Sequence, residues 1–489
     1  MTSPAFPSLR ITADALIPQG SFAEAQAAFL RPDPKLVVDL TRLLREKNAG
    51  VVAHFYMDPE LQGVLSACDW PHVHVSDSLA MADRAIAMAE QGVGTIAVLG
   101  VDFMSENVRA MLDASGFGHI PVYRLAAEPI GCSLAESAEA QAYGAYLMEA
   151  SETPHSLHVV YINTSLITKA KAHAVVPTIT CTSSNVVQTV LQAAAQVPDG
   201  HVWFGPDTYM GQNLAEIFHT MSDMTDRQIR EVHREHDRAS IRALLSRFHY
   251  FEQGTCIVHH MFGREVVDKV REHYPDAFVT AHLEVPGEMF ALGLEAQRRR
   301  EGVVGSTSNI LSFFLGKVDE AIARGESTQL RFILGTEAGM ITPIVRQVQD
   351  KLRDYASEGG PDISAEVIFP VASEAIAQEP ESGLGIVPGV AAGEGCSTAG
   401  GCATCPYMKM NSLRALIGLL ERVDNEPGSN LVPFEPRKYV QEISGRTAAD
   451  LGGEPILHMR AFQRESRLPK ALVDDVLARG RAPADSTGP

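Results

Sequence analysis

The chain has 489 residues, 45% of them hydrophobic and 21% charged, which is an ordinary composition for a globular protein of about three domains. Its 60 acidic and 41 basic residues give a formal net charge of −19, which argues against nucleic acid or an anionic membrane as a partner. The N-terminal sequence lacks the pattern of a secretory signal, and no apolar run reaches the roughly 18 residues of a membrane span. We therefore expect a cytoplasmic protein.

Strand-like and helix-like segments alternate along the chain, after a polar N-terminal stretch that contains one short helix at 21–30. Further helices are expected at 36–50 and 80–92. Short β-branched runs separated by helices of about 10–15 residues predict βαβ units, so we expect an α/β fold with parallel sheets. The expected strands, several of which continue into a turn, are 51–56, 72–79, 95–103, 157–165, 177–187, 201–211, 277–286, 303–311 and 330–340.

Four stretches depart from this alternation. Residues 219–250 are charged and helical, and we interpret them as an insertion with a solvated face. Residues 351–366 end a helix in a Gly/Pro turn. Residues 372–401 are rich in small residues and proline, so we expect a long loop of the kind that is usually functional or disordered. Residues 478–489 have the composition of a frayed tail.

The same polar pattern recurs three times. Each copy ends its first strand in polar residues, has a Ser/Thr-rich turn after its second strand, and carries Gly-x-Asp or Gly-x-Glu after its third. The spacing from the first feature to the second is 24, 22 and 24 residues in the three copies. The features are His54 to Tyr56, Ser76 to Ser78 and Gly100 to Asp102 in the first copy, Tyr161 to Asn163, Thr182 to Asn185 and Gly205 to Asp207 in the second, and His282 to Glu284, Ser306 to Asn309 and Gly335 to Glu337 in the third.

This recurrence predicts an internal triplication. We expect three homologous three-layer αβα domains with parallel sheets around a pseudo-threefold axis. The active site would lie at the centre, because ligands gather at the carboxyl ends of parallel strands. The expected domains are 36–140, 141–260 with the insertion at about 219–250, and 261–410 with the long loop, flanked by an N-terminal extension at 1–35 and C-terminal helices and tail at 411–489.

The seven cysteines are an odd number, which disfavours a disulfide framework and leaves metal ligands, redox residues or buried thiols. One cysteine follows the third strand of the first two copies, Cys132 and Cys256, and the pair Cys402 and Cys405 follows the third. The repeat therefore predicts three thiolates at the centre. Three thiolates on a [4Fe–4S] cube leave one iron without a protein ligand, and that iron can act as a Lewis acid on a substrate oxygen.

The other cysteines have simpler interpretations. We expect Cys68 and Cys181 to be core thiols and Cys396 to be a spare thiol in the Gly-rich loop. His259 follows Cys256 at the Cys-x-x-His spacing of a zinc site, but no second such pair exists in the chain, so zinc is disfavoured.

The motifs around these residues occur in the same order in quinolinate synthases, which the chain resembles over roughly residues 40–415, apart from 219–250 and the loop before Cys402. The motifs are weak singly and specific together: HFY, VSDSLAMA, YINTS, CTSSNVV, FGPD, GTCIVHHMF, AHLEVP, GSTSNIL and CPYMKMN. The resemblance implies three similar α/β domains around a [4Fe–4S] cluster with three cysteine ligands, one per domain. It also implies the condensation of iminoaspartate with dihydroxyacetone phosphate to quinolinate in NAD biosynthesis, with loss of phosphate and two waters.

By this resemblance, the cluster ligands are Cys132, Cys256 and Cys405. Some members carry C-x-x-C-x-x-C-P at the third ligand, whereas this chain has Ala399 where the first of those cysteines would stand. Cys402 is then a spare thiol or a redox partner of Cys405. We hypothesise that a disulfide between the two takes Cys405 off the cluster, and the idea fails if Cys402→Ser leaves the response to oxidation unchanged.

The residues at the strand ends are the candidate catalytic groups. His54 and His282 close apolar strands, where a histidine is more often structural, but their equivalent repeat positions and the resemblance imply catalytic and substrate-binding roles. We expect Tyr56 and Glu284 to carry protons, since imine–enamine exchange and loss of water each need a proton taken and a proton given. Which of the two is the acid stays open. Glu284 is also expected to bind substrate.

Anion binding is expected from hydroxyl residues at helix starts, namely Ser78, Ser183, Ser306 and Thr307. The alternative is plain N-capping, and both roles can hold at one helix N-terminus. Tyr161 and Asn163 are expected to orient a carboxylate of the substrate. Asn185 and Asn309 are interpreted as caps of turns.

The resemblance thus implies a transferase and cyclase that acts on small molecules and has a functional link to an aspartate oxidase or dehydrogenase, the sources of iminoaspartate that the family leads us to expect. The first alternative is an iron–sulfur hydro-lyase that acts on a small hydroxy acid through the same open iron. A second alternative is a non-enzymatic iron–sulfur carrier or sensor.

Overall fold

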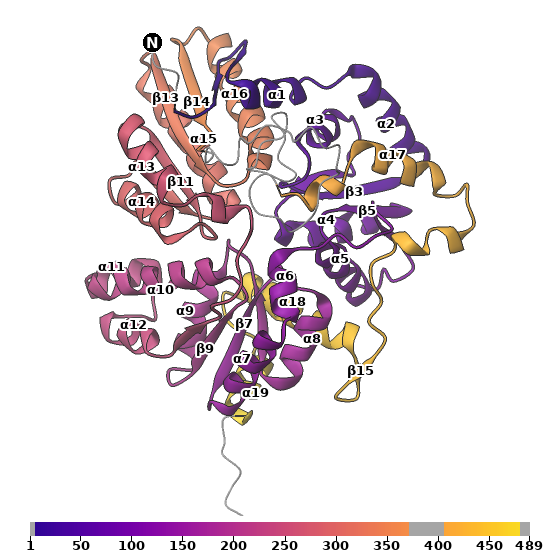
Figure 1. The fold of residues 1–489 in the computed structure, drawn as a ribbon, viewed down its shortest axis with the longest axis vertical. Coiled ribbons are helices and arrows are strands. Elements are labelled where there is room, and N and C mark those ends of the chain that lie inside the picture. Colours follow the sequence, from indigo (N-terminus) through magenta and orange to yellow (C-terminus); the bar gives the residue numbers. More distant parts are fainter. Residues whose placement is uncertain (1–4, 371–404, 480–489) are drawn as a thin grey trace, which may run out of the picture. The chain divides into compact units, whose positions relative to one another are not determined.

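The computed structural model describes residues 5–370 and 405–479, which fall into two compact units (Figure 1). The first unit comprises 5–101, 119–131, 257–370 and 405–436. The second unit comprises 102–118, 132–256 and 437–479. The first unit contains two sheets with parallel strands, and the second unit contains one.

One sheet of the first unit has four parallel strands in the order β4-β3-β5-β6. Its central strands, β3 (Ala49–His54) and β5 (Thr95–Leu99), are buried along their whole length, as expected of apolar runs between two layers of helix. The other elements are β4 (Val73–Ser76), β6 (Val122–Arg124), α2 (Pro34–Glu46), α3 (Pro59–Ala67) and α4 (Ser78–Glu90). Both α2 and α3 start at an Asp-Pro pair whose aspartate caps the helix, Asp33 and Asp58.

The other sheet of the first unit has six strands in the order β12-β11-β13-β14-β1-β2. Its parallel part consists of β11 (Phe278–His282), β12 (Gly302–Gly305), β13 (Thr328–Gly335) and β14 (Ile363–Ile368). The antiparallel hairpin β1 (Ser8–Ile11) and β2 (Leu16–Gln19) extends it from β14. Its helices are α13 (Arg264–His273), α14 (Gly287–Arg298), α15 (Thr307–Arg324) and α16 (Ile341–Ser357).

The N-terminal stretch is therefore structured beyond the one helix expected from the sequence. That helix is present as α1 (Ser21–Phe29), but residues 8–19 also form two strands of the six-stranded sheet. Leu9 and Ile11 of β1 are fully buried. A four-residue strand is too short to show a period, so sequence patterns missed it.

The second unit is built on a four-stranded parallel sheet in the order β10-β9-β7-β8. Its strands are β7 (Ser156–Tyr161), β8 (Thr178–Cys181), β9 (His201–Gly205) and β10 (Phe248–Tyr250). Its helices are α5 (Asp102–Ala114), α6 (Ser133–Glu139), α7 (Gln141–Glu152), α8 (Leu166–Val175), α9 (Val186–Gln196), α10 (Thr208–Asp223), α11 (Asp226–Val232), α12 (Arg238–Leu245), α18 (Ala448–Glu465) and α19 (Lys470–Arg479).

The three parallel sheets share one strand order, in which the second strand of each repeat lies outside the first and the fourth lies outside the third. The α/β class with parallel sheets is therefore confirmed. The fourth strands, β6, β10 and β14, were missed by the sequence analysis. Both β6 and β10 have only three residues, which is below the length at which a pattern of alternation can be recognised.

The stretch 219–250 joins β9 to the fourth strand of its own sheet, β10. It contains the end of α10, then α11 and α12, and it finishes in β10, which pairs in parallel with β9. The connections from β5 to β6 and from β13 to β14 have one main helix each, α5 and α16. The extra length relative to the other copies therefore lies in α11 and α12.

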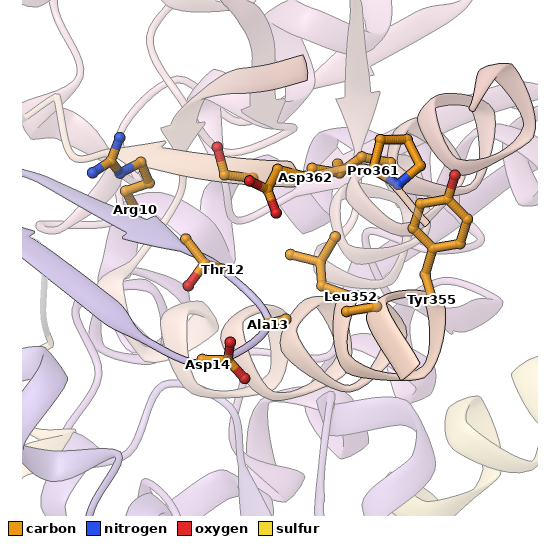
Figure 2. Close-up of a pocket in the computed structure, with 11 residues that line it drawn as sticks. Arg10, Thr12, Ala13, Asp14, Leu352, Tyr355, Pro361 and Asp362 are labelled. Carbon is orange, nitrogen blue, oxygen red and sulfur yellow. The ribbon is translucent and has the colours of Figure 1, made fainter. Parts of the chain in front are cut away.

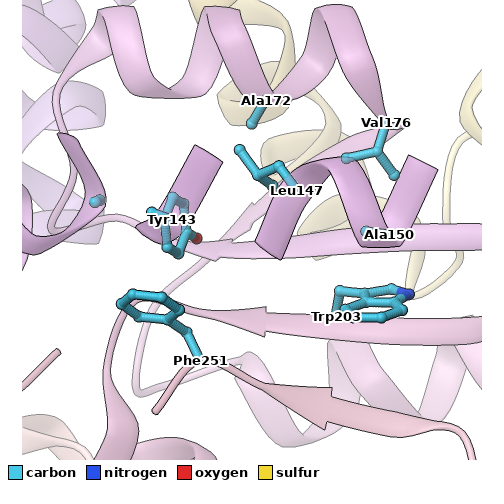
Figure 3. Packing of buried hydrophobic residues seen from close by; sticks show 8 residues of the cluster. Tyr143, Leu147, Ala150, Ala172, Val176, Trp203 and Phe251 are labelled. Carbon is cyan, nitrogen blue, oxygen red and sulfur yellow. The ribbon is translucent and has the colours of Figure 1, made fainter. Parts of the chain in front are cut away.

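The second unit has an aromatic core between α7 and its sheet (Figure 3). The Tyr143 ring meets Phe251 edge-on at 4.9 Å between centroids, and its hydroxyl lies 2.8 Å from His158 Nε2. Trp203 of β9 donates its indole N–H to the Ser156 hydroxyl, so its polar atom is satisfied inside the core. The cluster fixes α7 on the sheet.

The C-terminal segment belongs to both units. Helix α17 (Leu413–Arg422) packs on α2 in the first unit, whereas α18 packs on α8 and α5 in the second. A two-stranded hairpin, β15 (Glu442–Ile443) and β16 (Arg446–Thr447), precedes α18. Across the described residues, none of the helices is both long and apolar enough to cross a bilayer.

Candidate functional site

Three strand ends of the first unit carry the candidate groups. His54 is the last residue of β3 and His282 is the last residue of β11. Thr336 and Glu337 follow directly on β13, which pairs with β11. All four are buried, with exposed fractions of 6%, 2%, 1% and 1% in that order. The carboxyl ends of parallel strands thus bring together polar groups that the core would otherwise exclude.

A chain of contacts links the two predicted proton carriers. The Tyr56 hydroxyl lies 3.0 Å from the Thr336 hydroxyl, and His259 Nε2 lies 3.4 Å from the same Thr336 oxygen. His259 Nδ1 lies 3.0 Å from Glu284 Oε2, although the ring N–H direction does not align with that oxygen as a hydrogen bond. His259 is also stacked on His282, at 4.8 Å between ring centroids.

The two predicted histidines are held as neutral rings. Burial lowers the pKa of His54 to about 4 and that of His282 to about 3, against partial compensation from Glu284. The backbone N–H of Tyr56 donates to His54 Nδ1, and that of Glu284 donates to His282 Nδ1. An Nδ1 that accepts a hydrogen bond carries no proton, so each ring has its proton on Nε2. Both Nε2–H groups are then available as donors.

Glu337 lies beside the third predicted cysteine. Its Oε1 accepts the backbone N–H of Cys405 at 2.5 Å. Burial raises the pKa of Glu337 well above its usual range, and the nearby charge of Glu284 adds to this, whereas the Cys405 bond and Lys409 oppose it. The carboxyl group therefore favours its protonated form. Its hydrogen bond also holds the backbone of Cys405 beside the end of β13.

Hydrogen bonds from Gln62 hold two loops of the first unit together. Gln62 donates from its side-chain amide to the carbonyls of Phe55 and Gly339, the latter at 2.9 Å. A Cβ at Gly339 would lie 2.1 Å from the Phe55 carbonyl oxygen, so only glycine permits this approach. The loop after β3 and the turn after β13 are therefore in fixed register, which sets the Tyr56–Thr336 contact.

The helix starts of the first unit differ from one another in charge. The cap of α4 is Asp77, whose carboxylate accepts the Ala80 N–H at 3.0 Å, so Ser78 is the first helical residue and not the cap. Ser306 caps α15 in a reciprocal pair with Asn309, which confirms the interpretation of Asn309 as a cap. Thr307 follows and is buried. The first turn of α15 has no acidic residue of its own, but the Ser308 hydroxyl donates to Asp77 Oδ2 at 3.1 Å, so the carboxylate that caps α4 also lies beside the start of α15.

In the second unit, Tyr161 ends β7 and Asn163 stands in the turn before α8. Ser183 is half-buried in the turn before α9, which Asn185 caps. Asn185 Oδ1 accepts the Thr182 N–H at 2.8 Å and so closes the turn. Asn185 Nδ2 and Thr182 Oγ1 are buried without a hydrogen-bond partner among the described residues, which is unusual for buried polar atoms.

The three predicted cysteine ligands are half-buried thiols. Cys132 is the N-cap of α6 and, like Cys256, belongs to the second unit. The Ser133 hydroxyl donates to the Thr255 carbonyl at 3.0 Å, so the segments of Cys132 and Cys256 run side by side. Cys405 belongs to the first unit, and Cys402 and Cys396 lie outside the described residues.

Cys181 is a core thiol as predicted, whereas Cys68 is only half-buried at the C-terminal end of α3. The Cys181 thiol is fully buried, and this burial raises its pKa well above its usual range. Cys68 donates its S–H to the Val64 carbonyl at 3.3 Å, and burial raises the pKa of this thiol too.

A cavity of about 390 Å³ lies elsewhere in the first unit, between the β1–β2 hairpin, the start of β14 and α16 (Figure 2). Arg10, Asp14, Tyr355 and Asp362 are among its lining residues. None of the residues predicted as catalytic, substrate-binding or metal-binding lines it. Its walls mix one basic and two acidic side chains without an unpartnered buried group, so it offers no catalytic constellation.

Sequence analysis missed three residues of the site in the first unit: His259, Thr336 and Glu337. His259 was considered only as a zinc ligand with Cys256. Thr336 and Glu337 were used as markers of the third repeat, and no role was given to them. The available signal was their position at a third strand end, where Glu337 is equivalent in the repeat to Asp102 and Asp207.

Comparison with known proteins gives consistent matches. Residues 39–362 match the family model described as "Quinolinate synthetase A protein". The chain is 57% identical to a quinolinate synthase of Nicotiana tabacum, 53% to one of Oryza sativa subsp. japonica and 53% to one of Arabidopsis thaliana. The alignments cover 97%, 96% and 97% of this chain and 67%, 69% and 67% of the relatives.

These relatives correct one prediction. All of them are named chloroplastic enzymes, which contradicts the cytoplasmic location expected from the sequence. That expectation was wrong because it used only the absence of a secretory pattern and of an apolar span, and neither feature distinguishes the cytoplasm from a plastid.

Proposed function

Since the chain belongs to the quinolinate synthase family and is an enzyme of NAD biosynthesis, we propose that it condenses iminoaspartate with dihydroxyacetone phosphate to give quinolinate. The reaction releases one phosphate and two waters, so it is a transferase and cyclase reaction. The observation that carries the proposal is the chain of contacts from the half-buried Tyr56 through the buried Thr336 and His259 to the buried Glu284. This chain lies within the residues that match the family model.

The reaction needs groups that take and give protons. Imine–enamine exchange removes a proton from carbon, and each loss of water requires a proton on the departing oxygen. The Tyr56 hydroxyl and the Glu284 carboxyl are proposed to serve these steps, with Thr336 and His259 keeping the two in fixed positions. The exposed fraction of Glu284 is only 2%, so bulk water is kept from the carboxyl group.

Substrate anions are proposed to bind to neutral donors. His54 and His282 offer Nε2–H groups that stay uncharged at neutral pH because burial depresses their pKa values to about 4 and about 3. The N-terminus of α15 with Ser306 and Thr307 suits a carboxylate or a phosphate. Ser78 is proposed as a further donor, although the neighbouring Asp77 carboxylate makes that helix start less suited to an anion.

The second unit supplies a second set of donors in this proposal. Tyr161 and Asn163 would orient a substrate carboxylate, and Ser183 would bind an anionic group at the start of α9. The unpartnered Asn185 Nδ2 and Thr182 Oγ1 support a polar ligand at that turn. Asn185 was interpreted from sequence as a cap alone, and we now propose both roles for it.

A [4Fe–4S] cluster held by Cys132, Cys256 and Cys405 is proposed as the cofactor. The residues present fit such a group: all three are thiols, the Cys132 and Cys256 segments are joined by the Ser133–Thr255 bond, and the Cys405 amide is fixed on Glu337. When bound, a cluster with three protein ligands supplies a Lewis-acidic iron for a substrate oxygen. The protein residues then bind the anionic ends and move protons.

The test uses protein purified without oxygen and supplied with both substrates, iminoaspartate being formed in situ from oxaloacetate and ammonia. We expect quinolinate from the pair and none from either alone. The alternative hydro-lyase would release or add water on a hydroxy acid such as malate and would not join the two substrates. Supply of iminoaspartate by an aspartate oxidase or dehydrogenase is proposed as the preceding step.

A further inference from the structure

The turn that carries Asn163 is fixed along its whole backbone. The Ile162 N–H donates to the Cys181 carbonyl at 2.8 Å, and the Thr164 N–H donates to the Ile162 carbonyl at 2.8 Å. The Thr164 hydroxyl donates to the Tyr161 carbonyl at 3.1 Å. Within the described part of the chain, the Asn163 side-chain amide makes no hydrogen bond of its own. The turn is thus rigid and leaves one amide for a ligand.

Lys169 holds this turn from inside the second unit. Its side chain is 0% exposed, and its Nζ donates to the carbonyls of Ile162, at 3.2 Å, and Thr164. These are the two neighbours of Asn163. Burial lowers the pKa of Lys169 to about 7, whereas the charge of Glu106 opposes this shift. An ammonium group is costly to bury, so its use as a double donor to one turn indicates a positioning role.

Glu106 of α5 holds the other end of the turn. Its Oε2 accepts the N–H of Leu166, the first residue of α8, at 2.9 Å. A helix N-terminus stabilises a carboxylate, which opposes the rise in the pKa of Glu106 that burial causes. Glu106 thereby fixes the start of α8, which directly follows the turn of Asn163.

The C-terminal segment completes this arrangement. The Tyr439 hydroxyl donates to Glu106 Oε1 at 2.9 Å. In α18, a Cβ at Gly452 would lie 2.3 Å from the Leu166 carbonyl oxygen, so the helix backbone touches the start of α8. Tyr439 and Gly452 both lie beyond position 362, where the match to the family model ends.

We propose that Lys169, Glu106 and Tyr439 are positioning residues that hold the Asn163 amide ready for a substrate carboxylate, so that the C-terminal segment forms part of the substrate site. This inference rests on the proposed function, because it takes Asn163 as a substrate-binding residue. The competing explanation is that the three residues only stabilise the second unit. The two explanations differ in whether the effect of Tyr439 depends on Asn163.

The test measures the dissociation constant of oxaloacetate, a stable analogue of iminoaspartate, by calorimetry on oxygen-free protein. Tyr439→Phe removes one hydroxyl and is compared with Tyr146→Phe, which removes another buried hydroxyl, donated to the Phe204 carbonyl at 2.9 Å. We expect Tyr439→Phe to weaken binding about three- to tenfold, the range for one modest hydrogen bond. We expect Tyr146→Phe to leave it unchanged, and the thermal midpoints of both variants serve as the folding control.

Asn163→Ala provides the decisive comparison. It should weaken oxaloacetate binding, and the double variant Tyr439→Phe/Asn163→Ala should bind no worse than Asn163→Ala alone, because Tyr439 acts through Asn163. Additive effects, or an unchanged dissociation constant in Tyr439→Phe, would overturn the inference while wild-type quinolinate formation stands. If the wild-type protein makes no quinolinate from the two substrates, the proposed function fails and the inference fails with it.

Discussion

The hydroxyl groups of Tyr56 and Thr336 lie 3.0 Å apart, although 280 residues separate them in the chain and they follow strands of two different sheets. Thr336 also lies 3.4 Å from His259 Nε2. One hydroxyl group therefore sets the position of a predicted proton carrier on one side and of a histidine that contacts Glu284 on the other. The relative position of the two sheets therefore determines how the groups of the candidate site meet.

Replacement of Thr336 by valine keeps the shape of the side chain and removes this hydroxyl. We expect Thr336→Val to lower kcat for quinolinate formation about fivefold, because Tyr56 and His259 lose an orienting partner worth roughly 1 kcal/mol. Thr336→Ser retains the hydroxyl and should stay within about threefold of wild type. Equal kcat values for the valine variant and wild type would contradict a role for this contact.

We predict that Glu337 slows the loss of the proposed cluster, because it holds the backbone N–H of the ligand Cys405. A glutamine at this position still offers an oxygen to the Cys405 N–H, whereas an alanine does not. We therefore expect Glu337→Ala to lose iron to a chelator several times faster than wild type, and Glu337→Gln to resemble wild type. The measurement is the decay of visible absorbance after chelator is added to oxygen-free protein. Identical decay in the two variants would show that the hydrogen bond does not matter.

Asn411 is predicted to anchor the segment that follows Cys405. It is fully buried, accepts the Gly100 N–H through Oδ1, and donates through Nδ2 to the carbonyls of Gly100 and Met408. Asn411→Ala should lower the free energy of unfolding by roughly 2–3 kcal/mol, since several buried hydrogen bonds lose their partner. Urea unfolding measures this, with the exposed Asn425→Ala as control. A loss below that of the control would refute the anchoring role.

Acid should destabilise the fold through His158. Burial lowers its pKa to about 3 in the folded protein, below its ordinary value of 6.5. The neutral ring therefore stabilises the fold fully above about pH 6.5, and this contribution is lost as pH falls towards the folded pKa. The slope reaches about 1.4 kcal/mol per pH unit and histidine.

His158→Gln should therefore show a weaker fall in the free energy of unfolding between pH 6.5 and pH 5 than wild type. Both proteins lose the contributions of other buried histidines, such as His54, so only the difference between them reports on His158. Urea unfolding at the two pH values gives the comparison. Equal falls in the free energy of unfolding of the two proteins would mean that His158 does not contribute to the loss of stability in acid.

The sequence predicted the repeated core of the fold because that core carries the strongest patterns. The apolar runs at β3, β7 and β11 and the polar residues that end them, His54, Tyr161 and His282, could be aligned by spacing alone. The same order in three sheets agrees with that alignment. The fourth strands and the β1–β2 hairpin were not predictable, because three or four residues do not define a period.

The site was predictable only where a residue stands in a repeated motif. His54, Tyr56, His282 and Glu284 do so, and Thr336 and His259 link them in the first unit. His259 enters the same site from a short helical turn, His259–Met261, which lies outside the strand-end features used to align the repeats. Likewise, the bond between Tyr439 and Glu106 joins segments 333 residues apart, and no local pattern records such a contact.

The most direct test of the account is the iron and acid-labile sulfide content per chain of oxygen-free protein, measured for wild type and for single alanine variants of the cysteines. We predict about four irons per chain in wild type, loss of iron in Cys132→Ala, Cys256→Ala and Cys405→Ala, and full retention in Cys402→Ala and Cys68→Ala. Iron that survives the loss of Cys132 or Cys256, or a wild-type protein without iron, would contradict a cluster held by one thiol from each repeat.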